Sequence, residues 1–110
     1  MAKEDGFIVV QITTRDEAEA RKLANLLLEK KKAVCVNIVP KVSTLYRWQG
    51  KIESGTESLM IIKTKNSHLG DIIALVKENH SYEVLEVIAM PVTGGSPDYL
   101  AWLEEELRGA

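Results

Sequence analysis

Cysteine is scarce in this sequence, and Cys35 is the single thiol among 110 residues. One thiol cannot form a disulfide within the chain, so the sequence suits a reducing compartment. Long apolar runs are also missing, because a stretch such as Leu59–Ile62 is far shorter than the roughly 20 residues that cross a bilayer. Residues 1–7 contain no apolar segment typical of a secretion signal. We therefore expect a cytoplasmic protein with no membrane partner.

An excess of charge of either sign is missing as well. Fourteen lysines and arginines oppose 16 aspartates and glutamates, which gives a formal net charge of −2. A nucleic-acid-binding domain normally carries a basic patch or stripe. The basic run Lys30–Lys32 ends a helical pattern, where it either complements the helix dipole or binds phosphate, and we favour the dipole. We therefore expect no nucleic-acid partner.

The length and composition indicate one globular domain over residues 1–110. Hydrophobic residues make up 45% of the chain and charged residues 27%, which is ordinary for a folded protein. A domain of this size buries only about two-thirds of the surface of its unfolded chain. Oligomerisation would bury more, and the size of the chain favours it.

Hydrophobic periodicity predicts four strands and three helices. Thr14 and Glu17 have the spacing of a capping box for the first helix, and Ser67 is placed to cap the second. Ser96 and Pro97 are typical of the residues that begin a third helix. The predicted strands are 7–12, 33–38 continued by 42–48, 52–64 interrupted at 54–56, and 82–92, and the helices run from 14 to the lysine run, from 67 to 80 and from 97 to 107.

The second and third strands form an unusually long hairpin. Gln49-Gly50 supplies its turn, and Pro40 removes a ladder hydrogen bond, so we expect a bulge there. The outer half of such a hairpin has little of its own chain to pack against. The element order predicts an α+β fold, the ferredoxin-like βαββαβ sandwich, with this extended hairpin and a C-terminal helix.

This fold hosts many unrelated functions, so the sites must decide among them. An RNA-recognition module needs paired aromatic residues on its central strands, and Ser58–Ile62 is aliphatic. An acylphosphatase-like enzyme needs a phosphate cradle, and no glycine-rich loop accompanies Arg15. The sequence shows no recognisable arrangement of a catalytic nucleophile and a general base, so we expect a binding protein rather than an enzyme.

Five residues could carry binding chemistry. Cys35 is either a small buried hydrophobic residue or a soft metal ligand. His80 either stabilises a helix C-terminus or binds metal with Cys35, Glu83 or Glu86. Lys63 either keeps its ammonium group in water, neutralises a carboxylate or binds an anionic ligand. Glu83 and Glu86 have odd spacing on a predicted strand, which places them on opposite faces and makes them a poor acid–base pair.

The aromatic residues gather at the hairpin tip and on the last helix. Tyr46 and Trp48 precede the turn, and Tyr99 and Trp102 lie on the helix. Aromatic side chains in such places are typical of interface anchors. We expect Tyr46, Trp48 and Trp102 to lie at a subunit interface.

Several segments together resemble the CutA family, the divalent-cation tolerance proteins. The resemblance runs from Ile8 to Trp102, and it implies a tight homotrimer in which each long hairpin reaches the neighbouring subunit. It also implies inter-subunit clefts that contain Cys35, Lys63, His80 and Glu83, and a link to copper tolerance. The matching segments are Ala33–Ile38, Tyr46–Ile52, Lys63-Thr64, His80–Glu83 and Asp98–Trp102.

The chain also departs from the family pattern. Ile12 and Asn79 stand where some members have a cysteine and a second histidine, and Ser81 and Leu85 replace usual prolines. Two hypotheses remain open. In one, a trimer binds copper or another divalent cation through His80 with Cys35 or Glu83. In the other, a signalling or scaffolding trimer, analogous to the PII proteins, holds a small anionic ligand with Lys63, Tyr82 and Glu83.

Overall fold

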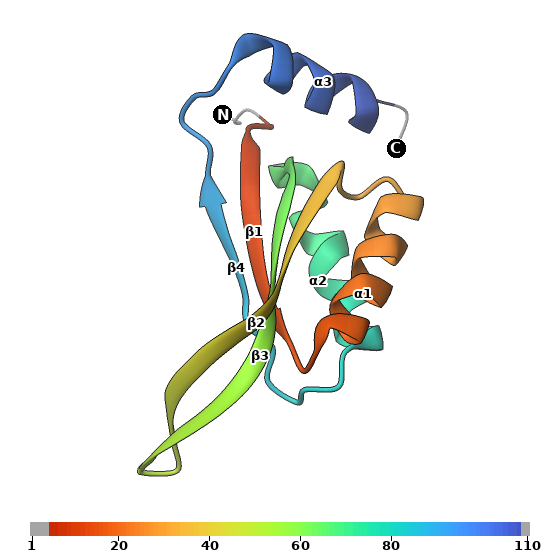
Figure 1. Ribbon diagram of the computed structural model, residues 1–110. Coiled ribbons are helices and arrows are strands. Elements are labelled where there is room, and N and C mark those ends of the chain that lie inside the picture. The colour runs from red at the N-terminus through yellow and green to blue at the C-terminus, as the bar shows by residue number, and fades with distance from the viewer. Residues whose placement is uncertain (1–4, 109–110) are drawn as a thin grey trace.

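The computed structural model describes residues 5–108, and its element order confirms the ferredoxin-like α+β fold. Residues 1–4, on which part of the expectation about a secretion signal rests, lie outside the described range. Figure 1 shows two helices packed on one side of a sheet and a third helix across one end of it. The elements are β1 (Phe7–Thr14), α1 (Glu17–Glu29), β2 (Cys35–Trp48), β3 (Lys51–Lys65), the 3-10 turn η1 (Asn66–His68), α2 (Leu69–Asn79), β4 (Val87–Pro91) and α3 (Pro97–Leu107).

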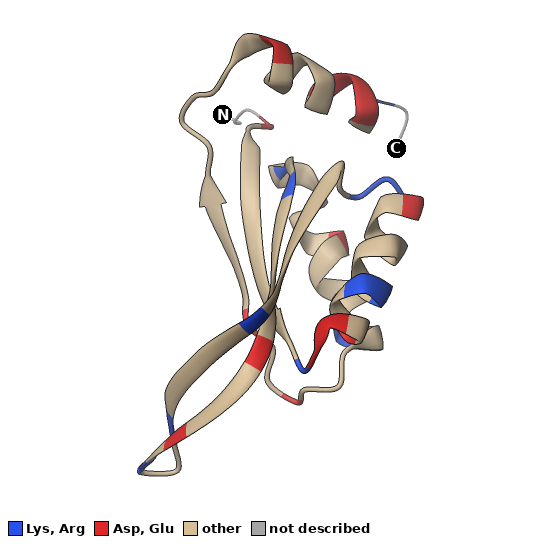
Figure 2. Ribbon diagram, viewed as in Figure 1, with Lys and Arg blue, Asp and Glu red and all other residues tan. Residues whose placement is uncertain are grey.

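The four strands form one antiparallel sheet in the order β2-β3-β1-β4. Alternate residues of the central strands point toward α1 and α2, because successive side chains of a strand point to opposite faces. The core between sheet and helices contains apolar side chains that are fully buried: Val10, Ile12, Leu23, Leu27, Met60, Ile62, Ile72 and Val76. Figure 2 shows β1 and β4 almost free of charge, with charged residues on the hairpin and on the helices.

The opposite face of the sheet remains open over much of its area. Val39, Ile88 and Met90 lie on it, and their exposed fractions are 37%, 52% and 41%. α3 crosses the end of the sheet where β1 begins and buries Leu103 and Leu107 (Figure 1). The protomer thus leaves apolar strand residues in contact with solvent.

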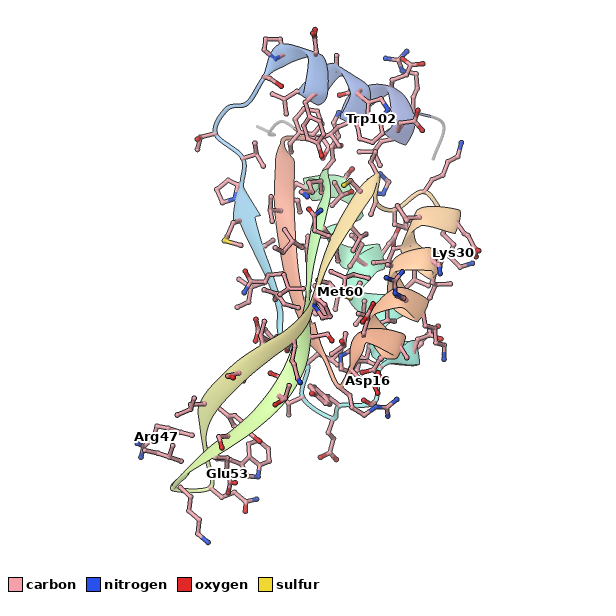
Figure 3. All side chains as sticks on the ribbon, viewed as in Figure 1. Asp16, Lys30, Arg47, Glu53, Met60 and Trp102 are labelled. Carbon is pink, nitrogen blue, oxygen red and sulfur yellow. The ribbon has the colours of Figure 1, made fainter. Side chains whose placement is uncertain are left out.

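The N-cap of helix α1 lies two residues later than predicted, at Asp16 rather than Thr14. Asp16 is the N-cap, and its Oδ1 accepts a hydrogen bond from the backbone N–H of Glu19 at 2.9 Å. Thr14 instead donates its hydroxyl hydrogen to the carbonyl of Asp16. The prediction of Thr14 with Glu17 was wrong because Asp16 and Glu19 have the same three-residue spacing and the aspartate sits nearer the first helical turn. Figure 3 shows Asp16 at one end of α1 and Lys30 at the other.

The hairpin of β2 and β3 confirms two sequence predictions and corrects a third. The pairing register shifts between Val39 and Val42, on either side of Pro40. Gln49 and Gly50 both have positive φ, 51° and 82°, as a two-residue hairpin turn requires. The predicted interruption at 54–56 is absent, since pairing with β2 continues there and β3 runs unbroken from Lys51 to Lys65. The hairpin projects well beyond the helices, and Figure 3 shows Arg47 and Glu53 near its far end.

Two further boundaries differ from the predictions. Ser67 lies in η1, where its backbone N–H and hydroxyl both bond Asp5, and α2 has no side-chain cap. The fourth strand begins at Val87, because β1 pairs with β4 only from Ile12↔Val87 onward. Residues 80–86 therefore form a connecting segment rather than the start of a strand, and the two-face argument for Glu83 and Glu86 does not apply.

Candidate functional site

A cleft of about 580 Å³ lies between the hairpin and the segment that joins α2 to β4. Its volume is within the range of small-molecule binding sites. The walls combine residues of β1, β2 and β3 with residues of the connecting segment. The lining residues are Thr13, Thr44, Tyr46, Trp48, Gly55, Thr56, Glu57, Ser81, Tyr82, Glu83, Val84 and Glu86.

His80 fixes the start of the connecting segment through both nitrogens of its ring. Nε2 lies 2.8 Å from the carbonyl oxygen of Thr13, which can only accept, so Nε2 carries the hydrogen. Nδ1 lies 3.0 Å from the backbone nitrogen of Tyr82, which donates to it. Both ring nitrogens are therefore engaged within the chain, and a metal ion at His80 must displace one of these bonds.

Glu19 ties the same segment to the start of α1. Its Oε2 accepts from the backbone N–H of Ser81 at 2.8 Å, and its Oε1 accepts from the N–H of Arg15 at 2.9 Å and the hydroxyl of Ser81 at 3.2 Å. The side chain is buried, with 6% exposed. Burial alone would raise the pKa of Glu19, but these hydrogen bonds outweigh it and hold the pKa below its ordinary value of 4.5.

Sequence analysis missed this role of Glu19. The available signal was its three-residue spacing from Asp16, which is that of a capping box. In a capping box, the side chain at the third helical position accepts a hydrogen bond from the backbone N–H of the N-cap residue. Here Glu19 accepts instead from the N–H of Arg15, one residue before the N-cap. Its second oxygen is then free for Ser81, and this long-range contact has no local sequence signal.

Tyr82 lines the cleft and links its two walls. Its hydroxyl donates to Oε2 of Glu57 on β3 at 2.7 Å, and its ring lies 4.7 Å from the ring of His80. Burial raises the pKa of Tyr82 above its ordinary value of 10.0, and the carboxylate of Glu57 raises it further. The phenol therefore stays protonated as a donor and links the connecting segment to the hairpin.

The cleft is negatively charged and partly aromatic. Glu57, Glu83 and Glu86 line it, and no lysine, arginine or histidine of residues 5–108 does. Tyr46 and Trp48 lie two residues apart on β2, so they share one face of the hairpin, and each is 48% exposed. Such a lining attracts cations and repels anions.

Cys35 and Lys63 lie together at the other end of the sheet. They are direct cross-strand partners, and Nζ of Lys63 lies 3.9 Å from Sγ of Cys35. The same ammonium group donates to the side-chain oxygen of Asn37. Tyr99 of α3 lies beside the thiol. Burial is the main cause that raises the pKa of Tyr99, and a hydrogen bond with Cys35 is the second.

The structure does not bring the predicted ligands into one site within the protomer. Cys35 and Lys63 are in register with Val9, whereas the carbonyl that binds His80 belongs to Thr13 on the same strand. Four residues of antiparallel strand correspond to about 14 Å. Within residues 5–108, no group of three or more His, Cys, Asp or Glu side chains could hold a metal ion. Tyr82 and Glu83 share the cleft, and Cys35 and Lys63 do not reach it.

The predicted interface aromatics are all partly exposed. Tyr46 and Trp48 face the cleft, and Trp102 packs on Tyr99 with ring centroids 5.7 Å apart. Sequence analysis missed two apolar residues on the other face of the hairpin: Leu45 and Ile52, each 71% exposed. They are diagonal neighbours in the Leu45↔Ser54 and Arg47↔Ile52 register, so they form one apolar patch, the hairpin patch.

The fold and the cleft define a small α+β domain with an extended hairpin and an acidic cleft beside it. A family model described as "CutA1 divalent ion tolerance protein" matches residues 8–106. This chain therefore belongs to the CutA1 divalent ion tolerance family, as the sequence segments predicted.

Curated relatives and solved structures agree with this assignment. Divalent-cation tolerance protein CutA of Pectobacterium atrosepticum is 42% identical over 92% of this chain and 92% of its own length. Chloroplastic protein CutA of Arabidopsis thaliana is 48% identical, and this chain spans only 56% of it. The chain spans a similar 57% of the rice relative. CutA1 from Oryza sativa superimposes with a TM-score of 0.90 at 42% identity, over 94% of this chain and 95% of that structure.

The relatives' names describe tolerance to divalent cations rather than a catalysed reaction. The structure of CutA from Archaeoglobus fulgidus, titled a periplasmic divalent cation tolerance protein, has a TM-score of 0.89 at 36% identity, over 93% of this chain and 99% of that one. In residues 5–108 of the present chain, no helix has the length and apolar character needed to cross a membrane.

Proposed function

We propose that this chain forms a homotrimer that acts in divalent-cation tolerance without catalysing a reaction, by binding copper or another divalent cation at clefts between subunits. The observation that carries this proposal is the charge of the cleft. Three carboxylates line it, and none of its lining residues in the described chain is cationic. Carboxylates are ligands for hard divalent cations, and imidazole and thiolate suit copper.

Association of subunits is supported by the surfaces that the protomer leaves open. The hairpin patch of Leu45 and Ile52 and the open sheet face with Ile88 and Met90 expose large apolar side chains. Exposed apolar patches on a soluble domain mark interaction sites. β2 and β4 are also the edge strands of the sheet, and unpaired edges favour strand pairing between chains. Tyr46, Trp48 and Trp102 are the proposed aromatic contacts.

A shared site would solve the separation of the predicted ligands. Cys35 lies about 14 Å along the sheet from the backbone that holds His80, so one chain cannot supply both to a single ion. A neighbouring subunit could present its Cys35 to the cleft that contains Glu83. His80 would join only after its Nδ1 loses the hydrogen bond from Tyr82.

A second candidate function has its own supporting observation. Lys63 contacts the side chains of Cys35 and Asn37, and no carboxylate of residues 5–108 forms a salt bridge with it. An ammonium group without an acidic partner can bind an anion. A signalling or scaffolding trimer that holds a small anionic ligand would thus use Lys63, with Tyr82 of a neighbouring subunit across the interface.

Calorimetric titration with copper tests the first candidate. We expect saturable binding to the wild-type protein that weakens about tenfold or more in Glu83→Gln and in His80→Ala, since each removes one ligand. His68→Ala is the matched control, because His68 lies in η1, outside the lining of the cleft. His80→Ala also removes contacts that hold the segment, whereas Glu83 is exposed and its substitution should leave the fold intact. Unchanged copper affinity in both Glu83→Gln and His80→Ala would refute the cleft as the metal site.

We propose a cytoplasmic location, which the single unpaired thiol supports. Relatives carry the descriptions chloroplastic, for Arabidopsis thaliana, and periplasmic, for Archaeoglobus fulgidus. Fractionation of the source cells, followed by immunodetection, tests the proposal. Recovery in a periplasmic or organellar fraction would refute it.

A further inference from the structure

The cleft is much larger than a single metal ion requires. Metal ligands converge to about 2.0–2.6 Å from an ion, whereas this cavity has a volume of about 580 Å³. Glu57, Glu83 and Glu86 are distributed around it, and no group of three acidic, histidine or cysteine side chains in residues 5–108 is close enough to hold an ion. The negative charge is therefore spread over a space of small-molecule size.

The aromatic lining of the cleft comes from two separate elements. Tyr46 and Trp48 project from β2, and Tyr82 projects from the connecting segment. The phenol of Tyr82 donates to Glu57, which holds its ring in the lining of the cleft. Tyr46 lies close enough to contribute to the raised pKa of Tyr82. Tyr46 and Trp48 are each 48% exposed in the single chain, and in the proposed trimer they lie where the cleft meets the neighbouring subunit.

We propose that the cleft binds a small organic cation with an alkylated ammonium group. Aromatic faces attract such a cation through the ring quadrupole, and the effect is strongest when tryptophan takes part and water is excluded. Carboxylates near the rings supply the opposite charge without the close convergence that a metal ion needs. A metal ion gains little from Tyr46 and Trp48, whereas a bulky ammonium group gains from both the rings and the carboxylates.

This inference uses the cleft of the proposed function but does not depend on metal binding. If the cleft recognises the charge of the ligand, a cation should bind more tightly than a neutral molecule of the same shape, whereas apolar contact alone would favour neither. Choline and its neutral isostere 3,3-dimethylbutan-1-ol have the same shape and differ in the charged nitrogen, so they are matched probes. Calorimetry of the full chain with each probe, in low-salt buffer, measures the contribution of the charge.

We expect choline to bind at least tenfold more tightly than the neutral isostere. Glu83→Gln should weaken choline about three- to tenfold, and Trp48→Leu should weaken it by a similar factor, because it keeps apolar volume and loses the ring. Trp48→Phe should retain most of the affinity, and Glu78→Gln, on the exposed side of α2, should retain all of it. Circular dichroism verifies that each variant is folded, and sedimentation verifies that it keeps the assembly of the wild type.

Two results would overturn the inference: equal binding of the two probes, or no binding of choline to the folded wild-type protein. Copper in the same titration separates this inference from the proposed function. Copper binding without choline binding would refute the organic cation and leave the metal proposal standing. Choline binding without copper binding would support the organic cation and refute the metal proposal.

Discussion

Replacement of Glu19 by alanine should destabilise the protein and release the segment that forms one wall of the cleft. The carboxylate accepts three hydrogen bonds, two from backbone N–H groups of Arg15 and Ser81 and one from the hydroxyl of Ser81. A hydrogen bond to a charged group contributes about 1.5–3 kcal/mol net when buried. Arg15 and Ser81 are exposed, so water can replace part of the loss. We therefore expect a loss of about 2–3 kcal/mol.

Urea denaturation at a fixed protein concentration measures this loss, because the stability of an oligomer depends on concentration. Glu17→Ala is the matched control. Glu17 lies in the same helical turn and forms an exposed salt bridge with Arg21, a type of pair worth about 0.3–0.5 kcal/mol. The reasoning would be refuted if Glu19→Ala lay within 0.5 kcal/mol of Glu17→Ala, on the scale of normal error for such extrapolations.

The contribution of Glu19 should also depend on pH. Its pKa is lower in the folded protein than the ordinary value of 4.5. The stabilisation is therefore fully present above about pH 5 and is lost as the pH falls below 4.5 through the folded pKa. The stability difference between wild type and Glu19→Gln should be constant from about pH 6 to 8 and shrink toward pH 3. A difference that grows on acidification would contradict this assignment.

Three further changes test other parts of the structure. Lys31 has a φ of 56° and closes a Schellman motif at the end of α1, so Lys31→Gly should stabilise the fold by up to about 1 kcal/mol in thermal melts, and a loss would refute it. Met60→Ala should cost about 2–5 kcal/mol in denaturant, since the side chain is fully buried, and a cost below 1 would contradict that packing. Leu45→Ser with Ile52→Ser should weaken assembly in sedimentation without changing the circular dichroism spectrum, whereas an unchanged sedimentation profile would refute the hairpin patch as an interface.

Local sequence signals predicted the parts of the fold that local physics decides. Apolar spacing identified the helices, Pro40 predicted the register shift, and Gln49-Gly50 predicted the turn because only certain residues tolerate positive φ. The order of these elements then restricted the topology to a ferredoxin-like fold. The family, which the comparison confirms over residues 8–106, was also recognisable from segments of the sequence.

The candidate site was harder to predict because it depends on contacts between distant parts of the chain. Residues 82–86 contain apolar side chains and were predicted as the start of a strand, yet His80, Ser81 and Tyr82 are held by Thr13, Glu19 and Glu57. None of these partners is near in sequence. The separation of Cys35 from His80 likewise follows from strand register, which composition and spacing do not specify.

Native mass spectrometry across a copper titration tests the central claim most directly. The proposed function predicts a species of three chains that takes up three equivalent copper ions, and Glu83→Gln should lose them while remaining a trimer. A protein that stays monomeric at micromolar concentration, or a trimer that takes up no stoichiometric metal, would contradict the proposed inter-subunit cation site.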